Sequence, residues 1–221
     1  MSLVAGDSQP WQRWVSAWPD VLAFAAGLAV AWHAGWNTTD LVWSLWLASL
    51  VVGYAMIVWM IFSRALGSPL LLGGGLFLLA FFTFHFGFFH FVHSVFLANF
   101  FPVGDAGEKR FINAAMYADI ARQYWMFVPV ALLAERDHFR LPPRGEATGD
   151  KTGLKALVGD KNGGMMAPYR NVIRLHLLIF FFAAVHFTGL DNFFVYAVVY
   201  AVYFFPWRLV KAENVAASAE T

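Results

Sequence analysis

Residues 69–101 read PLLLGGGLFLLAFFTFHFGFFHFVHSVFLANFF, and this stretch decides the fold class of the chain. It contains no Asp, Glu, Lys or Arg and is longer than the roughly 20 apolar residues that a membrane span needs. Because a backbone in lipid must satisfy its own hydrogen bonds, such a stretch is expected to form a transmembrane helix. The chain is therefore predicted to be an integral membrane protein.

The composition of the whole chain agrees with this prediction. Of the 221 residues, 60% are hydrophobic, 19% are aromatic and only 13% are charged, whereas soluble domains carry about 25% charged residues. The net charge of +1 gives no indication of a nucleic-acid partner, so membrane lipid is the expected partner. The absence of cysteine excludes disulfides, thiolate metal sites and cysteine nucleophiles.

Five further stretches reach or approach the length of a span, which predicts an all-α polytopic membrane helix bundle with about six transmembrane helices. The chain is predicted to be a single transmembrane domain over 1–221, with spans at about 21–36, 41–62, 69–101, 116–134, 172–190 and 193–210. The first 19 residues lack the basic start and short apolar run of a signal peptide, so the first span is expected to be retained as an anchor.

The basic residues orient this bundle. With the N-terminus inside, the cytoplasmic segments carry Arg13, Arg64 and the densely basic loop at 135–170, while the opposite side has only Lys109 and Arg110. Cytoplasmic segments of membrane proteins carry an excess of Lys and Arg. The chain is therefore predicted to be N-in/C-in and multi-pass in a bacterial inner (cytoplasmic) membrane.

Two backbone features are expected to affect the course and the packing of the predicted helices. Pro129, within the fourth span, is expected to kink or end a helix, and the glycine run at 73–75 is expected to permit close helix approach. The stretch at about 140–168 is rich in Gly, Pro and charge, which predicts a mobile cytoplasmic loop.

Histidines inside the apolar spans are the main functional signal. Six of the seven lie in or beside predicted spans: His33, His85, His90, His93, His176 and His186. Polar side chains within a span are costly and are therefore often functional. His90 and His93 are three residues apart on one helix face and can bind one ion, whereas His85 and His93 are separated by about 12 Å along the axis.

The depth of each histidine in the bundle predicts a metal site. His90, His93, His186 and His33 are expected to form one layer near the outer surface, where imidazoles suit zinc, copper or iron. His85 and His176 lie deeper and are expected to line the same cavity or a second one that holds a cofactor.

The outer half of the fourth span is polar, and its polar side chains are expected to face the bundle rather than lipid. These residues are Asp119, Arg122 and Gln123. Asp119 is the candidate catalytic residue, because a carboxylate can orient a metal ligand or accept a proton. The alternative is that Asp119 and Arg122, three residues apart on a helix, neutralise each other.

Other interpretations of the histidines remain open. A histidine from each of the third and fifth spans can supply the axial ligands of a haem, with the many phenylalanines around the macrocycle. A single histidine in a helix bundle is ordinarily hydrogen-bonded to a neighbour. A cluster of unpaired imidazoles in lipid would be costly, however, which favours a shared role.

Two short motifs resemble the signatures of an uncharacterised bacterial family of multi-pass inner-membrane proteins, classed as a domain of unknown function. The first motif is His85-Phe86-Gly87 followed by His93, and the second is MMAPYR at 165–170 leading into LHL at 175–177. The family usually has Tyr where this chain has Phe86. The resemblance implies the membrane architecture and a functional set of His85, His93 and His176, and it implies no known activity.

The predicted function is the binding of a transition metal by the intramembrane histidines, for redox or hydrolytic chemistry, with enzyme activity left open. One alternative is a haem- or quinone-linked electron carrier. Another is a non-enzymatic assembly subunit or a small transporter whose histidines relay protons. A homo-oligomer and a larger membrane complex both remain open as protein assemblies.

Overall fold

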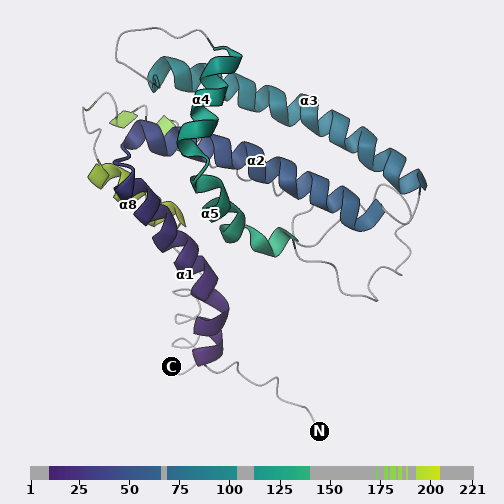
Figure 1. The fold of residues 1–221 in the computed structure, drawn as a ribbon, viewed down its shortest axis with the longest axis horizontal. Coiled ribbons are helices and arrows are strands. Elements are labelled where there is room, and N and C mark those ends of the chain that lie inside the picture. Colours follow the sequence, from purple (N-terminus) through teal and green to yellow (C-terminus); the bar gives the residue numbers. More distant parts are fainter. Residues whose placement is uncertain are drawn as a thin grey trace, which may run out of the picture.

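The computed structural model is all-helical over the residues that it describes: 10–65, 69–103, 112–139, 193–204 and isolated positions between 173 and 188 (Figure 1). Its elements are α1 (Pro10–His33), α2 (Thr38–Ala65), α3 (Pro69–Phe100), α4 (Ala114–Tyr124), α5 (Phe127–Ala134), the 3-10 helix η1 (Arg136–Phe139) and α8 (Phe193–Phe204). The predicted all-α class is thereby confirmed. The loop predicted at 140–168 lies outside the described residues, as does most of the span predicted at 172–190.

The helices α2 and α3 lie side by side along the longest dimension of the molecule (Figure 1). In the described part of the chain, these two helices are long and apolar enough to cross a membrane, judged by length and composition, over Thr38–Ser63 and Leu72–Phe100. The boundaries predicted for them, 41–62 and 69–101, differ from the observed ends by at most three residues.

Glycines set how closely α2 and α3 approach. A Cβ atom added to Gly53 of α2 would lie 2.5 Å from the ring of Phe86, and one added to Gly75 of α3 would lie 2.7 Å from Ile61. Gly75 thus makes the close approach expected of the glycine run, whereas Gly73 faces open space. The small residue on one helix receives a large apolar side chain from the other, as is common between membrane helices.

The turn between α1 and α2 is fixed by local hydrogen bonds. Gly35 adopts a positive φ of 65°, and the N–H groups of Gly35 and Trp36 donate to the carbonyls of Trp32 and Ala31 at 3.2 and 2.9 Å. This pair of bonds is the Schellman motif that ends many helices. Asn37 and Asp40 then begin α2 by exchanging side-chain to backbone hydrogen bonds of 3.2 and 2.9 Å.

The fourth predicted span, 116–134, is two helices in the structure rather than one. The helix α4 ends at Tyr124 and α5 begins at Phe127. Pro129 has no N–H to donate to the carbonyl of Trp125, which instead accepts from Val128 at 3.0 Å. The expected effect of Pro129 is therefore confirmed, and the chain changes direction between α4 and α5 (Figure 1).

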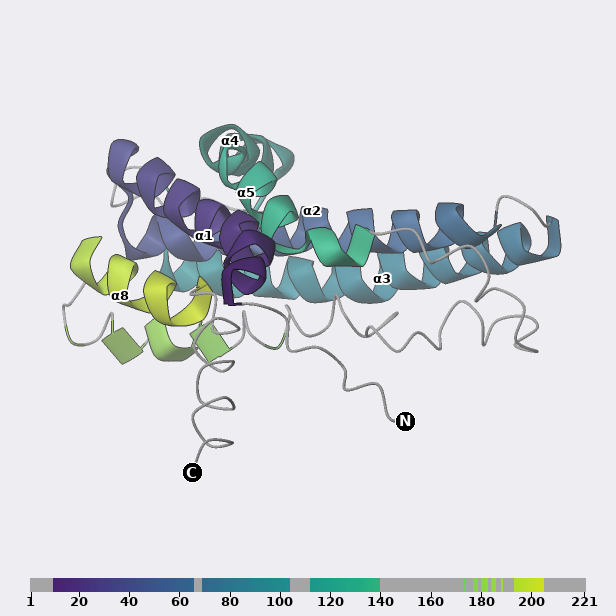
Figure 2. The same cartoon turned by 90° about the horizontal axis from the view of Figure 1, so that it is seen from below.

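The first half of α2 is the centre of the described fold. Residues 41–49 are all buried, and α2 as a whole contacts α3, α4, α5 and α8. The helix α1 packs on α5 and α8, and Figure 2 shows α4 and α8 on opposite sides of α1. Close approach of α8 to α1 requires Gly27, because a Cβ atom there would overlap the hydroxyl of Tyr200.

Candidate functional site

Buried polar side chains gather where α3 faces α2 and α4. The side chains of His90 and His93 are 1% and 4% exposed, although the helix that carries them is otherwise apolar. Their ring centroids are 6.3 Å apart, and Ser94 beside them is also buried. The predicted proximity of these two imidazoles on one helix face is therefore observed.

Both ring nitrogens of His90 have a defined neighbour. Its Nδ1 lies 3.1 Å from the carbonyl oxygen of Phe86, and its Nε2 lies 3.3 Å from the hydroxyl of Ser49 on α2. A carbonyl can only accept, so Nδ1 carries the hydrogen and donates to Phe86. The other ring nitrogen, Nε2, is thereby directed at the Ser49 hydroxyl on α2.

Aromatic side chains pack around His90. The ring of Phe86 lies 4.2 Å from the imidazole, centroid to centroid, and the indole of Trp46 lies at 6.0 Å. The Trp46 indole N–H also donates to the backbone carbonyl of His90 at 2.9 Å. About one turn of α3, from Phe86 to His90, and one turn of α2, from Trp46 to Ser49, therefore hold the imidazole in position.

The helix α4 reaches this buried patch through Tyr117. The hydroxyl of Ser94 donates to the carbonyl of Phe91 at 2.6 Å, so it accepts from the Tyr117 hydroxyl, which lies at 2.7 Å. The Tyr117 ring stacks on Trp46 with centroids 5.8 Å apart and an interplanar angle of 13°. Sequence reasoning missed Tyr117, although it lies beside Met116 on the buried face of α4.

The remaining predicted metal ligands do not join His90 and His93 within the described residues. His33 is exposed at the end of α1. In the part of the chain that the structure describes, no group of three or more His, Cys, Asp or Glu side chains is positioned to hold a metal ion. His176 and His186 lie outside the described residues, so the larger ligand set stays a prediction.

His85 has a different environment from His90. It is half-buried, its ring stacks on Phe81 with centroids 5.6 Å apart, and its face meets the edge of Phe89 at 5.1 Å. The two histidines therefore occupy different aromatic surroundings on the same helix. A cofactor role for His85 together with His176 stays a prediction.

Asp119 and Arg122 of α4 do not face the helix bundle, contrary to expectation. The side chains of Asp119 and Arg122 are 43% and 79% exposed and lie 3.3 Å apart, so they pair with each other on the surface. Gln123 is also exposed and donates to Asp40 at 3.3 Å. Met116, Ile120 and Tyr124, spaced four residues apart, are the residues that α4 buries. The polar face points outward because this apolar stripe is what packs on α2.

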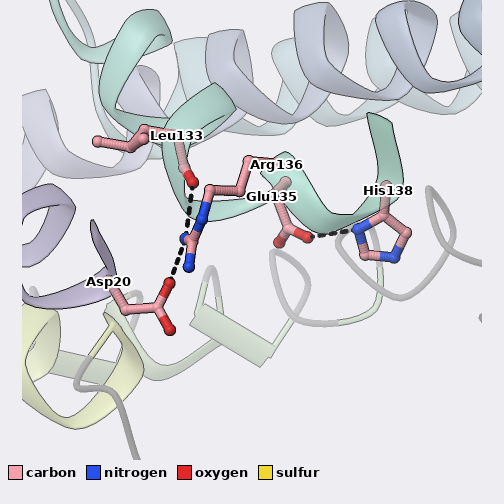
Figure 3. A network of polar contacts seen from close by, with 5 residues as sticks. All are labelled: Asp20, Leu133, Glu135, Arg136 and His138. Atoms are coloured by element: carbon pink, nitrogen blue, oxygen red, sulfur yellow. Dashed lines mark hydrogen bonds and ion pairs between the residues drawn. The ribbon is translucent and has the colours of Figure 1, made fainter. Parts of the chain in front are cut away.

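A second polar network joins α1 to the segment after α5 (Figure 3). The guanidinium of Arg136 donates to the carboxylate of Asp20 and to the carbonyl of Leu133. Glu135 and His138 form an adjacent pair at 3.2 Å. The Asp20 and Arg136 side chains are only 13% and 22% exposed, so this ion pair is largely withdrawn from solvent.

The fold and the buried patch define a class of protein: an all-helical chain with two helices apolar enough to span a membrane and with two imidazoles buried between helices. The chain belongs to a family of unknown function, DUF6498, whose model matches residues 8–205. This membership agrees with the resemblance to an uncharacterised family. No curated protein and no solved structure matches the chain.

Proposed function

We propose that this protein is a multi-pass membrane protein that binds a transition metal ion at the buried histidines of α3. The proposal includes the six-span, N-in/C-in arrangement in a bacterial inner membrane. It is supported by the two long apolar helices, by the exposed apolar side chains along α3 and by the bias of basic residues toward one side of the predicted topology.

The hydrogen bonding of His90 is the observation that carries the proposal. A histidine that binds a metal usually donates its other ring N–H to a carbonyl or carboxylate, which fixes the tautomer and aims the lone pair. His90 donates from Nδ1 to Phe86, and its Nε2 lies 3.3 Å from the Ser49 hydroxyl. A metal ion can replace that hydroxyl without disturbing the orienting bond.

His93 is the second proposed ligand, because it is buried and one turn from His90. His186 remains the proposed third ligand, with His176 and His85 assigned to the same or a neighbouring site. A ligand set of neutral imidazoles without thiolates favours zinc, copper or iron. Such an ion would supply Lewis-acid or redox chemistry, and the chain's own contribution is to orient the imidazoles and to exclude water.

Metal content and the visible spectrum of the detergent-purified protein test this proposal. Near-stoichiometric metal is expected in the wild type and in His138→Ala, because His138 lies in η1 and is not among the proposed ligands. His93→Ala and His90→Ala should each lose most of it. A Soret band would assign a haem in place of the ion. Absence of metal in a folded wild-type protein, with no visible absorption, would overturn the proposal.

A proton relay is the second candidate function, and one observation favours it. Hydroxyl groups from α2 and α4 hydrogen-bond at the buried patch, through Ser49 to His90 and through Tyr117 to Ser94. Such groups can pass protons between helices. If the purified protein holds no metal, proton flux into vesicles that contain the protein should fall in His90→Gln, and an unchanged flux would contradict this role.

A further inference from the structure

The helix α4 lies beside the buried histidine pair and is separated from α5 by a break at Trp125 and Met126. It packs on α2 and reaches α3 through the hydrogen bond between Tyr117 and Ser94. The stack of Tyr117 on Trp46 continues to His90, because Trp46 lies 6.0 Å from the imidazole. Tyr117 is therefore one aromatic ring removed from His90 and one hydrogen bond from Ser94, which is next to His93 in the chain.

A second hydrogen-bonded contact holds the other end of α4. The hydroxyl of Tyr124 donates to Asp40 at 2.8 Å, and Gln123 donates to the same carboxylate oxygen at 3.3 Å. Asp40 is itself fixed at the start of α2 by the backbone N–H of Asn37. Two tyrosine hydroxyls thus tie α4 down, one to each of the two long helices.

The connection from α4 to α5 provides a place for bending. Trp125 and Met126 keep helical dihedral angles, but the regular hydrogen-bond ladder is interrupted because Pro129 cannot donate to Trp125. Sharp helix kinks occur at prolines for this reason, and a missing ladder bond lowers the resistance to bending there.

We propose that α4 is a lid over the His90–His93 pair. It is latched by the Tyr117–Ser94 and Tyr124–Asp40 hydrogen bonds and opens about the kink at Trp125 and Met126 to admit a small cation. The identity of the admitted species rests on the proposed function. The opening of the lid does not, so each idea can fail without the other.

The native chain contains no cysteine, so a single introduced cysteine reports access to the pair. The reporter is His93→Cys, labelled with a charged, water-soluble methanethiosulfonate in detergent, and Ser49→Cys serves as a second reporter beneath the same lid. Neither measurement needs a bound metal. Ala34→Cys, on the exposed turn after α1, should label rapidly in every background.

Removing either latch hydroxyl, by Tyr117→Phe or Tyr124→Phe, should raise the labelling rate of the buried reporter by about 2- to 10-fold, the range that one net hydrogen bond implies. The two effects should multiply in the double variant. The matched control is Tyr54→Phe, which removes a 3.4 Å bond to Thr83 between α2 and α3 and should leave the rate unchanged. An unchanged labelling rate in the double variant, or an equal rise in Tyr54→Phe, would overturn the proposal that α4 is a lid.

Discussion

The two faces of α3 carry the same residue type in opposite surroundings. Phe82 and Phe86 are fully buried against α2, whereas Phe77 and Phe84 are 70% and 77% exposed. In lipid, phenylalanine gains little by leaving the surface of the protein, because the hydrocarbon is as apolar as the interior. The buried face is therefore distinguished from the exposed face by its shape, which fits Phe86 against Gly53, and by its polar groups, such as His90. Each of the following changes tests that distinction.

The largest difference is expected between Phe86→Ala and Phe84→Ala. Truncating Phe86 leaves a cavity opposite Gly53, and core Phe→Ala changes cost about 3–5 kcal/mol in the free energy of unfolding. Truncating the exposed Phe84 should change it by no more than about 0.5 kcal/mol. Unfolding by SDS in mixed micelles, followed by circular dichroism, measures both. Equal costs would mean that the two faces are not distinguished as described.

A smaller effect is expected from adding one methyl group to α2. Gly53→Ala places a Cβ atom 2.5 Å from the Phe86 ring, and overpacking of this kind costs about 1–3 kcal/mol. Gly73→Ala meets open space and should instead stabilise α3 by up to about 1 kcal/mol through helix propensity. The same titration compares them, and combining Gly53→Ala with Phe86→Leu should recover part of the loss. A neutral Gly53→Ala would show that α2 and α3 do not touch there.

The distinction between buried and exposed positions also applies to two ion pairs, Asp20–Arg136 and Asp119–Arg122. Asp20→Asn breaks the largely buried pair with Arg136 and should lower the unfolding free energy by about 1–2 kcal/mol, below the cost for a fully buried pair. Asp119→Asn affects an exposed pair, for which about 0–0.5 kcal/mol is expected. Thermal unfolding at low and at 1 M salt should show the first cost surviving and the second vanishing. A larger or more salt-resistant cost for Asp119→Asn than for Asp20→Asn would contradict the burial of Asp20.

The smallest effect is expected from removing the Ser49 hydroxyl. Ser49→Ala removes the hydroxyl that hydrogen-bonds His90 Nε2 and should cost about 0.5–1.5 kcal/mol in the free protein. Ser63→Ala, which removes a bond within α2 to Met60, is the control and should cost less. If a metal replaces the Ser49 hydroxyl, the cost should disappear in the loaded protein. A cost that persists with metal bound would mean that the metal does not replace the Ser49 hydroxyl.

The helices predicted best from the sequence are the two uninterrupted apolar runs, α2 and α3. The boundaries of α2 and α3 were close to those observed, because lipid-compatible composition and helix length coincide there. The segment 116–134 departed from a single span: the effect of Pro129 was expected from the sequence, whereas the outward direction of Asp119 and Arg122 was not, because it depends on which face of α4 packs on α2. The start of α1 at Pro10 also differed from 21, since a helix is not confined to its apolar part.

The candidate site was predictable to the extent that it lies on one helix. The spacing of His90 and His93 places both on one face, and the structure buries both. The position of His33 and the contribution of Tyr117 depend on how α1 and α4 cross the long pair. That crossing is set by turns and a kink, which residue spacing within a single helix does not encode.

The length of α3 has a consequence for any bilayer that it would span. Its apolar stretch, Leu72–Phe100, has 29 residues, or about 43 Å of helix at 1.5 Å per residue, against a hydrocarbon thickness of about 30 Å. The neighbouring stretch of α2 is nearly as long, at 26 residues, and it packs tightly against α3, so the pair must respond together to this hydrophobic mismatch. A membrane containing it is expected to tilt the pair steeply or to thicken around it, which favours thicker lipid surroundings.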